Sequence, residues 1–240
     1  MKQAEKTPAK PYNETNGCSQ KLSCGQVFAL IFFLAIETVH LVLIRVIVDM
    51  DIIIAYVMMG LAFLSLVFVA IDYVYLICFD PADPRLADPD LAKEGEELQL
   101  CVECDRNVLK NSYHCRACQR CVEGFDHHCV FLNNCIGKRN YSSFFRLLMT
   151  IILHTTLLIT IALIVVVERS GYERWLALGM AVMSLLVLLE VSVLAIFHCY
   201  ISFVLYQSTL EYLRGSSAKV SPAPEEGVAA EQSAMGMARG

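Results

Sequence analysis

The chain has 240 residues, of which 56% are hydrophobic and 18% are charged. Ordinary soluble domains average roughly 45–50% and about 25% for these two classes, so the composition argues against a water-soluble globular protein. The formal net charge is -5, from 19 Lys and Arg residues against 24 Asp and Glu residues. Because the chain has no basic excess, we expect no nucleic-acid partner.

Four hydrophobic runs stand out along the chain, and each is close to or above the roughly 20 residues that a helix needs to cross a bilayer. They cover residues 27–48, 52–79, 144–167 and 175–206. Buried helices of a soluble core are the alternative, but a chain of 240 residues could hardly bury four such segments. The predicted fold class is therefore an α-helical integral membrane protein with four transmembrane helices.

A long polar insert separates the second predicted helix from the third. The predicted organisation is an N-terminal tail (1–26), a first helix pair (27–79), the insert (80–143), a second helix pair (144–206) and a C-terminal tail (207–240). Four crossings place both tails and the insert on one side of the membrane. The N-terminal tail holds four Lys and Arg residues, the insert eight and the C-terminal tail three. This basic excess predicts that the three segments lie on the cytosolic side. The Ser-, Ala-, Gly-, Pro- and Glu-rich stretch after Arg214 is expected to be disordered.

The insert holds a repeated metal-ligand pattern. The spacing Cys-x2-Cys-x9-His-x6-Cys occurs twice at an offset of 14 residues, and the two sets interleave. The sets are Cys101, Cys104, His114, Cys121 and Cys115, Cys118, His128, Cys135. Three thiolates and one imidazole form a usual closed structural zinc site, so the pattern predicts two structural zinc ions that supply much of the folding free energy of the insert. Free cysteines are one alternative, and an iron–sulfur site is less favoured because each set contains a histidine.

Removing the eight ligands leaves one cysteine and one histidine between residues 101 and 135, namely Cys129 and His127, beside Asp126. A thiol nucleophile needs a base to form thiolate, and that base needs an acceptor that orients it. The run therefore suggests Cys129 as nucleophile, His127 as general base and Asp126 as the partner of the base. The alternative is an inert small cysteine beside a surface histidine.

The cysteine-rich segment resembles the corresponding domain of the DHHC-type protein S-acyltransferases, or palmitoyltransferases, closely over residues 101–143. Residues 80–82 (Asp-Pro-Ala) are similar to the Asp-Pro-Gly motif of that family, and residues 208–211 (Ser-Thr-Leu-Glu) to its Thr-Thr-x-Glu motif. The chain departs from the family pattern at residues 130–131, which are Val-Phe instead of Pro-Trp, and at Tyr113, where a second histidine is usual. The C-terminal family element that contains an asparagine is not recognisable.

The resemblance implies a protein-cysteine S-palmitoyltransferase with a cytosolic two-zinc insert. The acyl-CoA cosubstrate of such an enzyme would acylate Cys129, and membrane-associated proteins with cytosolic cysteines would then receive the acyl group. It also implies a multi-pass protein of the Golgi or endoplasmic reticulum membrane, with the plasma membrane as the alternative. A catalytically silent zinc-scaffolded membrane adaptor is the competing function. A cross-braced ubiquitin-ligase module on a membrane anchor fits less well, since its ligand order would differ.

Three basic residues near the start of the third helix are candidates for contacting the phosphates of CoA, namely Lys138, Arg139 and Arg146. Guanidinium groups pair well with phosphate oxygens. Membrane-anchoring charges on the cytosolic side are the alternative reading of each residue.

Ionisable residues inside membrane spans are functional suspects. We predict that His154 of the third helix and Glu190 of the fourth pair inside the bundle, and that Glu37 pairs with His40 at i, i+3 spacing. Small residues of the bundle, Gly60, Ala62 and Ala162, are candidates for letting an acyl chain pass, with ordinary helix packing as the alternative.

Four cysteines outside the insert carry weaker expectations. Cys18 and Cys24 lie just before the first helix and are candidates for S-acylation, with ordinary free thiols as the alternative. Cys78 and Cys199 are expected to pack as small hydrophobic residues.

Overall fold

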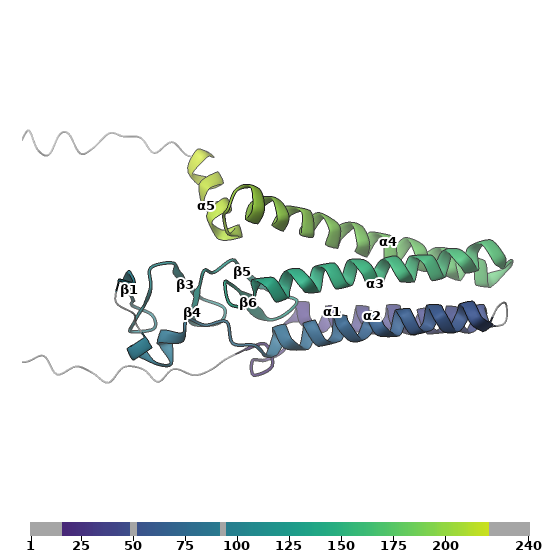
Figure 1. The fold of residues 1–240 in the computed structure, drawn as a ribbon, viewed down its shortest axis with the longest axis horizontal. Helices are drawn as coiled ribbons and strands as arrows, with labels where there is room; N and C mark the ends of the chain where they lie inside the picture. The colour runs from purple at the N-terminus through teal and green to yellow at the C-terminus, as the bar shows by residue number, and fades with distance from the viewer. Residues whose placement is uncertain (1–15, 49–51, 92–94, 221–240) are drawn as a thin grey trace, which may run out of the picture.

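The computed structural model describes residues 16–48, 52–91 and 95–220. Within these residues, four long helices run side by side, and the polar insert projects from one end of the bundle (Figure 1). The helices are α1 (Cys24–Val48), α2 (Ile52–Cys78), α3 (Tyr141–Glu168) and α4 (Tyr172–Cys199), and α4 continues as a π-helical segment, η3 (Tyr200–Val204). All four are long and apolar enough to cross a membrane. The predicted fold class is confirmed as four such helices with a cysteine-rich insert between the second and the third.

Three of the helices begin before the apolar runs that predicted them, at Cys24, Tyr141 and Tyr172. The first turn of each contains polar residues or glycine, which a hydropathy criterion leaves out of the apolar run. The first N–H groups of a helix have no partners inside the helix, so a polar first turn suits a helix end that faces water. Hydropathy therefore locates the membrane-crossing part of each helix better than its end.

The helix bundle is built around α3, which packs against α1, α2 and α4. At the end far from the insert, the buried side chains include small residues that let the helices approach closely, and Ala62 and Ala162 are among them. Gly60 differs from the expectation, because it is exposed and no atom lies within 4 Å of its Cβ position. At the end near the insert, larger side chains such as Leu76 and Phe144 form a second buried cluster.

The buried polar contacts inside the bundle differ from the predicted pairs. His154 Nε2 lies 2.9 Å from Glu37 Oε1 of α1, and its Nδ1 lies 2.8 Å from Ser65 Oγ of α2. Glu190 is exposed on α4, so the expected pair of His154 with Glu190 is wrong. The Nδ1 atom of His40 contacts the Ile36 carbonyl oxygen at 2.8 Å. The side chain of Glu37 therefore links α1 to α3 and does not form the predicted hydrogen bond with His40 on its own helix.

The insert contains three antiparallel hairpins, each a separate two-stranded sheet within the described residues. They are formed by β1 (Leu98–Cys101) with β2 (Arg106–Leu109), β3 (Ser112–Cys115) with β4 (Arg120–Glu123), and β5 (His127–Cys129) with β6 (Asn134–Ile136). The three hairpin turns contain residues with positive φ, namely Asp105, Gln119 and Asn133. An isolated two-stranded hairpin is marginal in water, so the insert needs further links between its hairpins. Two single 3-10 turns, η1 (Pro84–Leu86) and η2 (Pro89–Leu91), connect α2 to the first hairpin.

A further helix, α5 (Thr209–Val220), follows η3. Part of it falls in the stretch after Arg214 for which disorder was predicted, and there the prediction is wrong. The cause is a capping box, in which Glu211 Oε2 accepts bonds from the backbone N–H and the hydroxyl of Ser208 at 2.8 and 3.1 Å. The rest of that prediction concerns residues 221–240, which lie outside the described part of the chain.

A disulfide joins Cys18 to Cys78, with Cα atoms 5.2 Å apart. The expectation that Cys78 packs as an unbonded hydrophobic residue is wrong, and Cys18 is not available for acylation while this bond exists. Cys24 has a free thiol and is exposed at the start of α1. The disulfide fastens the segment before α1 to the end of α2.

Candidate active site and metal centres

Each predicted ligand set is brought together in the structure, with its four ligand atoms within 4.8 Å of one another. The first set takes one cysteine from the end of β1, one from the turn that follows it, and two ligands from the second hairpin, where His114 lies opposite Cys121. The second set takes one cysteine from the end of β3, one from the turn that follows it, and two ligands from the third hairpin, where His128 lies opposite Cys135. Each set therefore joins consecutive hairpins.

The chemistry of the two donor sets fits zinc. Each consists of three sulfur atoms and one imidazole, and Nδ1 of each histidine faces the sulfurs. In the first set His114 Nδ1 lies 3.3 Å from Cys104 Sγ, and in the second His128 Nδ1 lies 3.3 Å from Cys118 Sγ. All four ligand positions of each set come from the protein, as in a closed structural site.

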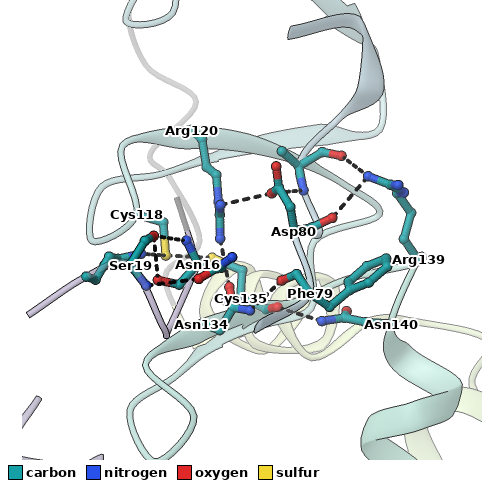
Figure 2. Close-up of polar contacts among 12 residues, drawn as sticks. Asn16, Ser19, Phe79, Asp80, Cys118, Arg120, Asn134, Cys135, Arg139 and Asn140 are labelled. Carbon is teal, nitrogen blue, oxygen red and sulfur yellow. Dashed lines mark hydrogen bonds and ion pairs between the residues drawn. The ribbon is translucent and has the colours of Figure 1, made fainter. Parts of the chain in front are cut away.

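A buried polar network joins the second and third hairpins to the end of α2 (Figure 2). Arg120 of β4 donates to Asp80 Oδ1 at 2.9 Å and to Asn134 Oδ1 at 2.7 Å. The amide group of Asn134 donates in turn to the carbonyl oxygens of Leu76 and Phe79 at the end of α2, each at 2.8 Å. The Asp-Pro-Ala motif thus holds the insert on the bundle through its aspartate.

The three basic residues predicted to contact CoA each have a partner within the chain. Arg139 donates to the carbonyl oxygens of Asp80 and Ala82 at 3.1 and 2.8 Å, and its guanidinium lies 5.2 Å from the centre of the Phe79 ring. Lys138 pairs with Glu123 and Arg146 with Asp72, each at 2.6 Å. Arg139 thereby stabilises the turn after α2 (Figure 2), and a role of these residues toward CoA remains a prediction.

The Asp-His-His-Cys run ends in strand β5, where successive side chains point to opposite faces. His128 turns to the second metal set, so His127 and Cys129 share the other face. The Nδ1 atom of His127 lies 2.7 Å from Asp126 Oδ2, so Nε2 is the ring nitrogen that remains for Cys129. The alternation of the strand separates the metal ligand from the candidate base and nucleophile.

Asp126 is buried, with 3% of its surface exposed, and Thr209 satisfies its carboxylate. The backbone N–H of Thr209 donates to Asp126 Oδ1 at 2.8 Å, and its hydroxyl donates to Oδ2 at 2.7 Å. Burial alone raises the pKa of Asp126, but the bonds from His127 and Thr209 outweigh it and hold the pKa below its usual value. The Thr of the Ser-Thr-Leu-Glu motif therefore keeps Asp126 charged and in place.

The pKa of His127 is raised to about 9. Burial lowers this pKa, but the interactions with Asp126 and Cys129 raise it by more. A protonated imidazole beside a thiol favours the thiolate, which is the nucleophilic form.

Cys129 lies where the insert meets the helix bundle. It packs against the buried cluster at the near end of the bundle, to which α2, α3 and α4 contribute Leu76, Phe144 and Ala195. An acyl group bound to its sulfur would therefore start at the apolar end of four membrane-spanning helices.

Sequence reasoning missed two neighbours of Asp126 and His127. Thr209 lies in a motif that the sequence analysis noted, but nothing local indicated that it contacts Asp126, 83 residues earlier. His198 of α4 has one nitrogen within 4.8 Å of the ligand atoms of Asp126 and His127. It lies in an apolar run without a spacing signal, so its proximity depends on how α4 packs.

Residues 94–216, just over half of the chain, match a family model described as DHHC palmitoyltransferase. A palmitoyltransferase erf2 of Emericella nidulans is 44% identical over 66 residues, which cover 28% of this chain and 11% of that protein. A probable protein S-acyltransferase 20 of Arabidopsis thaliana is 39% identical over 77 residues, covering 31% and 11%. A palmitoyltransferase ZDHHC8 of Mus musculus is 32% identical over 127 residues, covering 46% and 16%. The chain thus matches only 11–16% of the length of these curated relatives.

Proposed function

Because the chain belongs to the DHHC palmitoyltransferase family, we propose that it transfers a long-chain acyl group, palmitoyl as the first choice, from acyl-CoA to cysteine thiols of membrane-associated proteins. The acyl group passes through a thioester on Cys129. One observation carries this proposal beyond family membership. Hydrogen bonds join Thr209 to Asp126 and Asp126 to His127, the alternation of β5 places Cys129 on the same face as His127, and Cys129 packs against the apolar end of the helix bundle.

The proposed reaction has two steps. With Nδ1 of His127 bonded to Asp126, Nε2 takes the proton of the Cys129 thiol, and the thiolate attacks the thioester carbonyl of acyl-CoA. The bond from the carbonyl carbon to the CoA sulfur breaks, and CoA leaves as a thiol with the proton from His127. His127 then takes the proton of the substrate cysteine, whose sulfur attacks the acyl-enzyme and releases Cys129 as a thiol.

The two cysteine and histidine sets are proposed to hold zinc, which when bound supplies structural crosslinks between the hairpins. Three short hairpins bury little apolar surface, so metal binding contributes to folding directly. This role is separate from the chemistry at Cys129, because His128 faces the metal set and Cys129 does not belong to either set.

The substrates are proposed to meet at the membrane surface. The acyl chain enters the apolar bundle next to Cys129, while the CoA head group stays in water near Lys138, Arg139 and Arg146. For a phosphate to bind these residues, it has to share or replace their present partners. The protein substrates would present cysteines close to the same membrane face.

We propose that the insert and both tails face the cytosol at the Golgi or endoplasmic reticulum membrane, with the plasma membrane as the alternative. The distribution of Lys and Arg supports this orientation. The Cys18–Cys78 disulfide argues against it, because disulfides are rare in reducing compartments. A cytosolic location therefore predicts that Cys18 and Cys78 are reduced in cells.

The deciding experiment incubates the purified full-length protein with a series of alkyne-tagged acyl-CoAs of different chain length. We expect hydroxylamine-sensitive labelling of the wild type and none of Cys129→Ser. Absence of labelling in a folded wild-type protein with two zinc ions bound would support a silent zinc-scaffolded adaptor instead.

A further inference from the structure

The last turn of α4 places a second histidine against the candidate base. His198 is 2% exposed, and its ring centre lies 5.7 Å from that of His127. Phe144 of α3 contacts both rings edge-on, at 5.3 Å from His127 and 5.1 Å from His198. The His127 imidazole is therefore contacted by two aromatic rings that come from different helices.

His198 is itself held by a hydrogen bond. Its Nδ1 lies 3.0 Å from the hydroxyl oxygen of Tyr141, the first residue of α3. The same hydroxyl lies 2.5 Å from Ser202 Oγ in the π-helical segment that follows α4. Tyr141 thus bonds both His198 and the wide turn just after it, which sets the direction of the His198 ring.

The bond to Asp126 leaves one motion of His127 open. A single bond at Nδ1 fixes the distance between the imidazole and the carboxylate, but the ring can still rotate about that bond. Contacts on the ring faces and edges oppose this rotation, and His198 and Phe144 supply them. The orientation of the ring decides whether Nε2 reaches Cys129.

We propose that His198 is a positioning residue for His127 in the acyl transfer proposed above, on which this inference rests. The end of α4 then contributes twice to the site. His198 confines the base before the π-helical turn, and Thr209 holds Asp126 after it. Irregular π-helical turns are frequent at functional sites, and this one joins the two contacts.

The first experiment measures single-turnover formation of the acyl-enzyme from palmitoyl-CoA with the purified full-length protein. We expect His198→Ala to lower the maximal rate by about tenfold or more, since small displacements of a catalytic group cost up to about 100-fold. The half-saturating concentration of palmitoyl-CoA and the zinc content stay unchanged. His198→Phe, which keeps a flat ring, recovers most of the rate.

The decisive measurement is a double-mutant cycle with His127→Ala. If His198 acts through His127, His198→Ala produces no further loss once His127 is absent. Losses that multiply would show general loosening of the fold and overturn the proposal. Met180→Ala truncates another buried side chain of α4 and serves as the control. It measures how much the rate of acyl-enzyme formation falls when α4 is loosened away from the site.

Other outcomes separate the two proposals. A wild-type protein that forms no acyl-enzyme contradicts the proposed function itself. If the wild type forms the acyl-enzyme and His198→Ala forms it equally fast, only the role of His198 is contradicted. If His198→Ala does not fold, His198→Leu fills the same space without a flat ring and is compared with His198→Phe, and equal rates of these two overturn the proposal.

Discussion

At the residue scale, neighbouring cysteines and histidines of one hairpin have different surroundings. Cys135 is fully buried in the second metal set and lies opposite His128. Cys129, on the same hairpin, is partly exposed and lies opposite Asn134. The alternation of side chains along β5 and β6 separates the two cysteines more sharply than their spacing suggests.

We expect Cys135→Ser and Cys129→Ser to fail in different ways. Cys135→Ser lowers the zinc content below two per chain and destabilises the insert, because a hydroxyl replaces thiolate poorly on zinc. Cys129→Ser keeps both zinc ions and the fold but forms no hydroxylamine-sensitive intermediate. Metal analysis beside intermediate trapping measures both effects. Loss of zinc in Cys129→Ser would show that the assignment of roles is wrong.

Thr209→Val tests the contact that holds Asp126. The variant keeps the side-chain volume and the backbone N–H but removes the hydroxyl bond to Oδ2. We expect acyl-enzyme formation to slow by roughly tenfold, since hydrogen bonds to charged groups contribute about 1.5–3 kcal/mol. Thr156→Val, which changes an exposed threonine of α3 in the same way, serves as the control. Equal rates for the two variants would rule out a contribution from the Thr209 hydroxyl.

At the scale of elements, both polar and apolar contacts hold the insert on the bundle. Arg120 is almost completely buried and is linked to the end of α2 through Asp80 and Asn134 (Figure 2). Burying a charged guanidinium without its partners is costly. The family motif after α2 therefore has a structural role that can be measured separately from catalysis.

We expect Asp80→Ala to lower the free energy of unfolding by about 1–3 kcal/mol, because it removes an acceptor of a buried arginine. Thermal unfolding of the purified protein and the rate of zinc release to a chelator measure this loss. Asp90→Ala, an exposed carboxylate in η2, should change stability by no more than about 0.5 kcal/mol. An Asp80→Ala protein as stable as Asp90→Ala would contradict the structural role.

The helices, rather than the insert, are expected to read the length of the acyl chain. Ala162 is completely buried in the bundle, whereas Gly60 faces outward. We expect Ala162→Leu to shift the acyl-CoA preference toward shorter chains by filling the interior, and Gly60→Leu to leave it unchanged. The alkyne-tagged acyl-CoA series measures both. An unchanged preference in an active Ala162→Leu protein would exclude this part of the bundle from chain selection.

At the scale of the whole molecule, the four spans place the insert and α5 at the same end of the bundle, and the link between α3 and α4 at the other (Figure 1). Thr209 can reach Asp126 only because of this arrangement. Membrane topology is therefore part of how the candidate site is assembled.

Orientation is tested with tags at Ser217 and Ser170 in separate proteins. For a protein at the surface of sealed cells, an impermeant reagent should miss the tag at Ser217 and label the tag at Ser170, because the basic excess lies on the Ser217 side. For a protein in internal membranes, selective permeabilisation of the plasma membrane should expose Ser217 alone. The opposite pattern would place the insert outside the cytosol and agree with a stable Cys18–Cys78 disulfide.

The sequence by itself determined the features that depend on local periodicity. Run length and hydropathy predicted four spans, since a bilayer sets the minimum helix length. The 14-residue offset sorted eight ligands into two sets that the structure brings together. The capping box of α5 was also present in the sequence, but the polar composition around it favoured the wrong prediction of disorder.

Only the tertiary structure decided which distant side chains meet. His154 pairs with Glu37 across 117 positions, Asp126 with Thr209 across 83 and Cys18 with Cys78 across 60. Apolar residues surround a membrane helix on most sides, so its sequence carries little information about its rotation. Rotation and tilt are set by the packing of all the helices together, and for this reason Glu190 faces outward while His198 lies against His127.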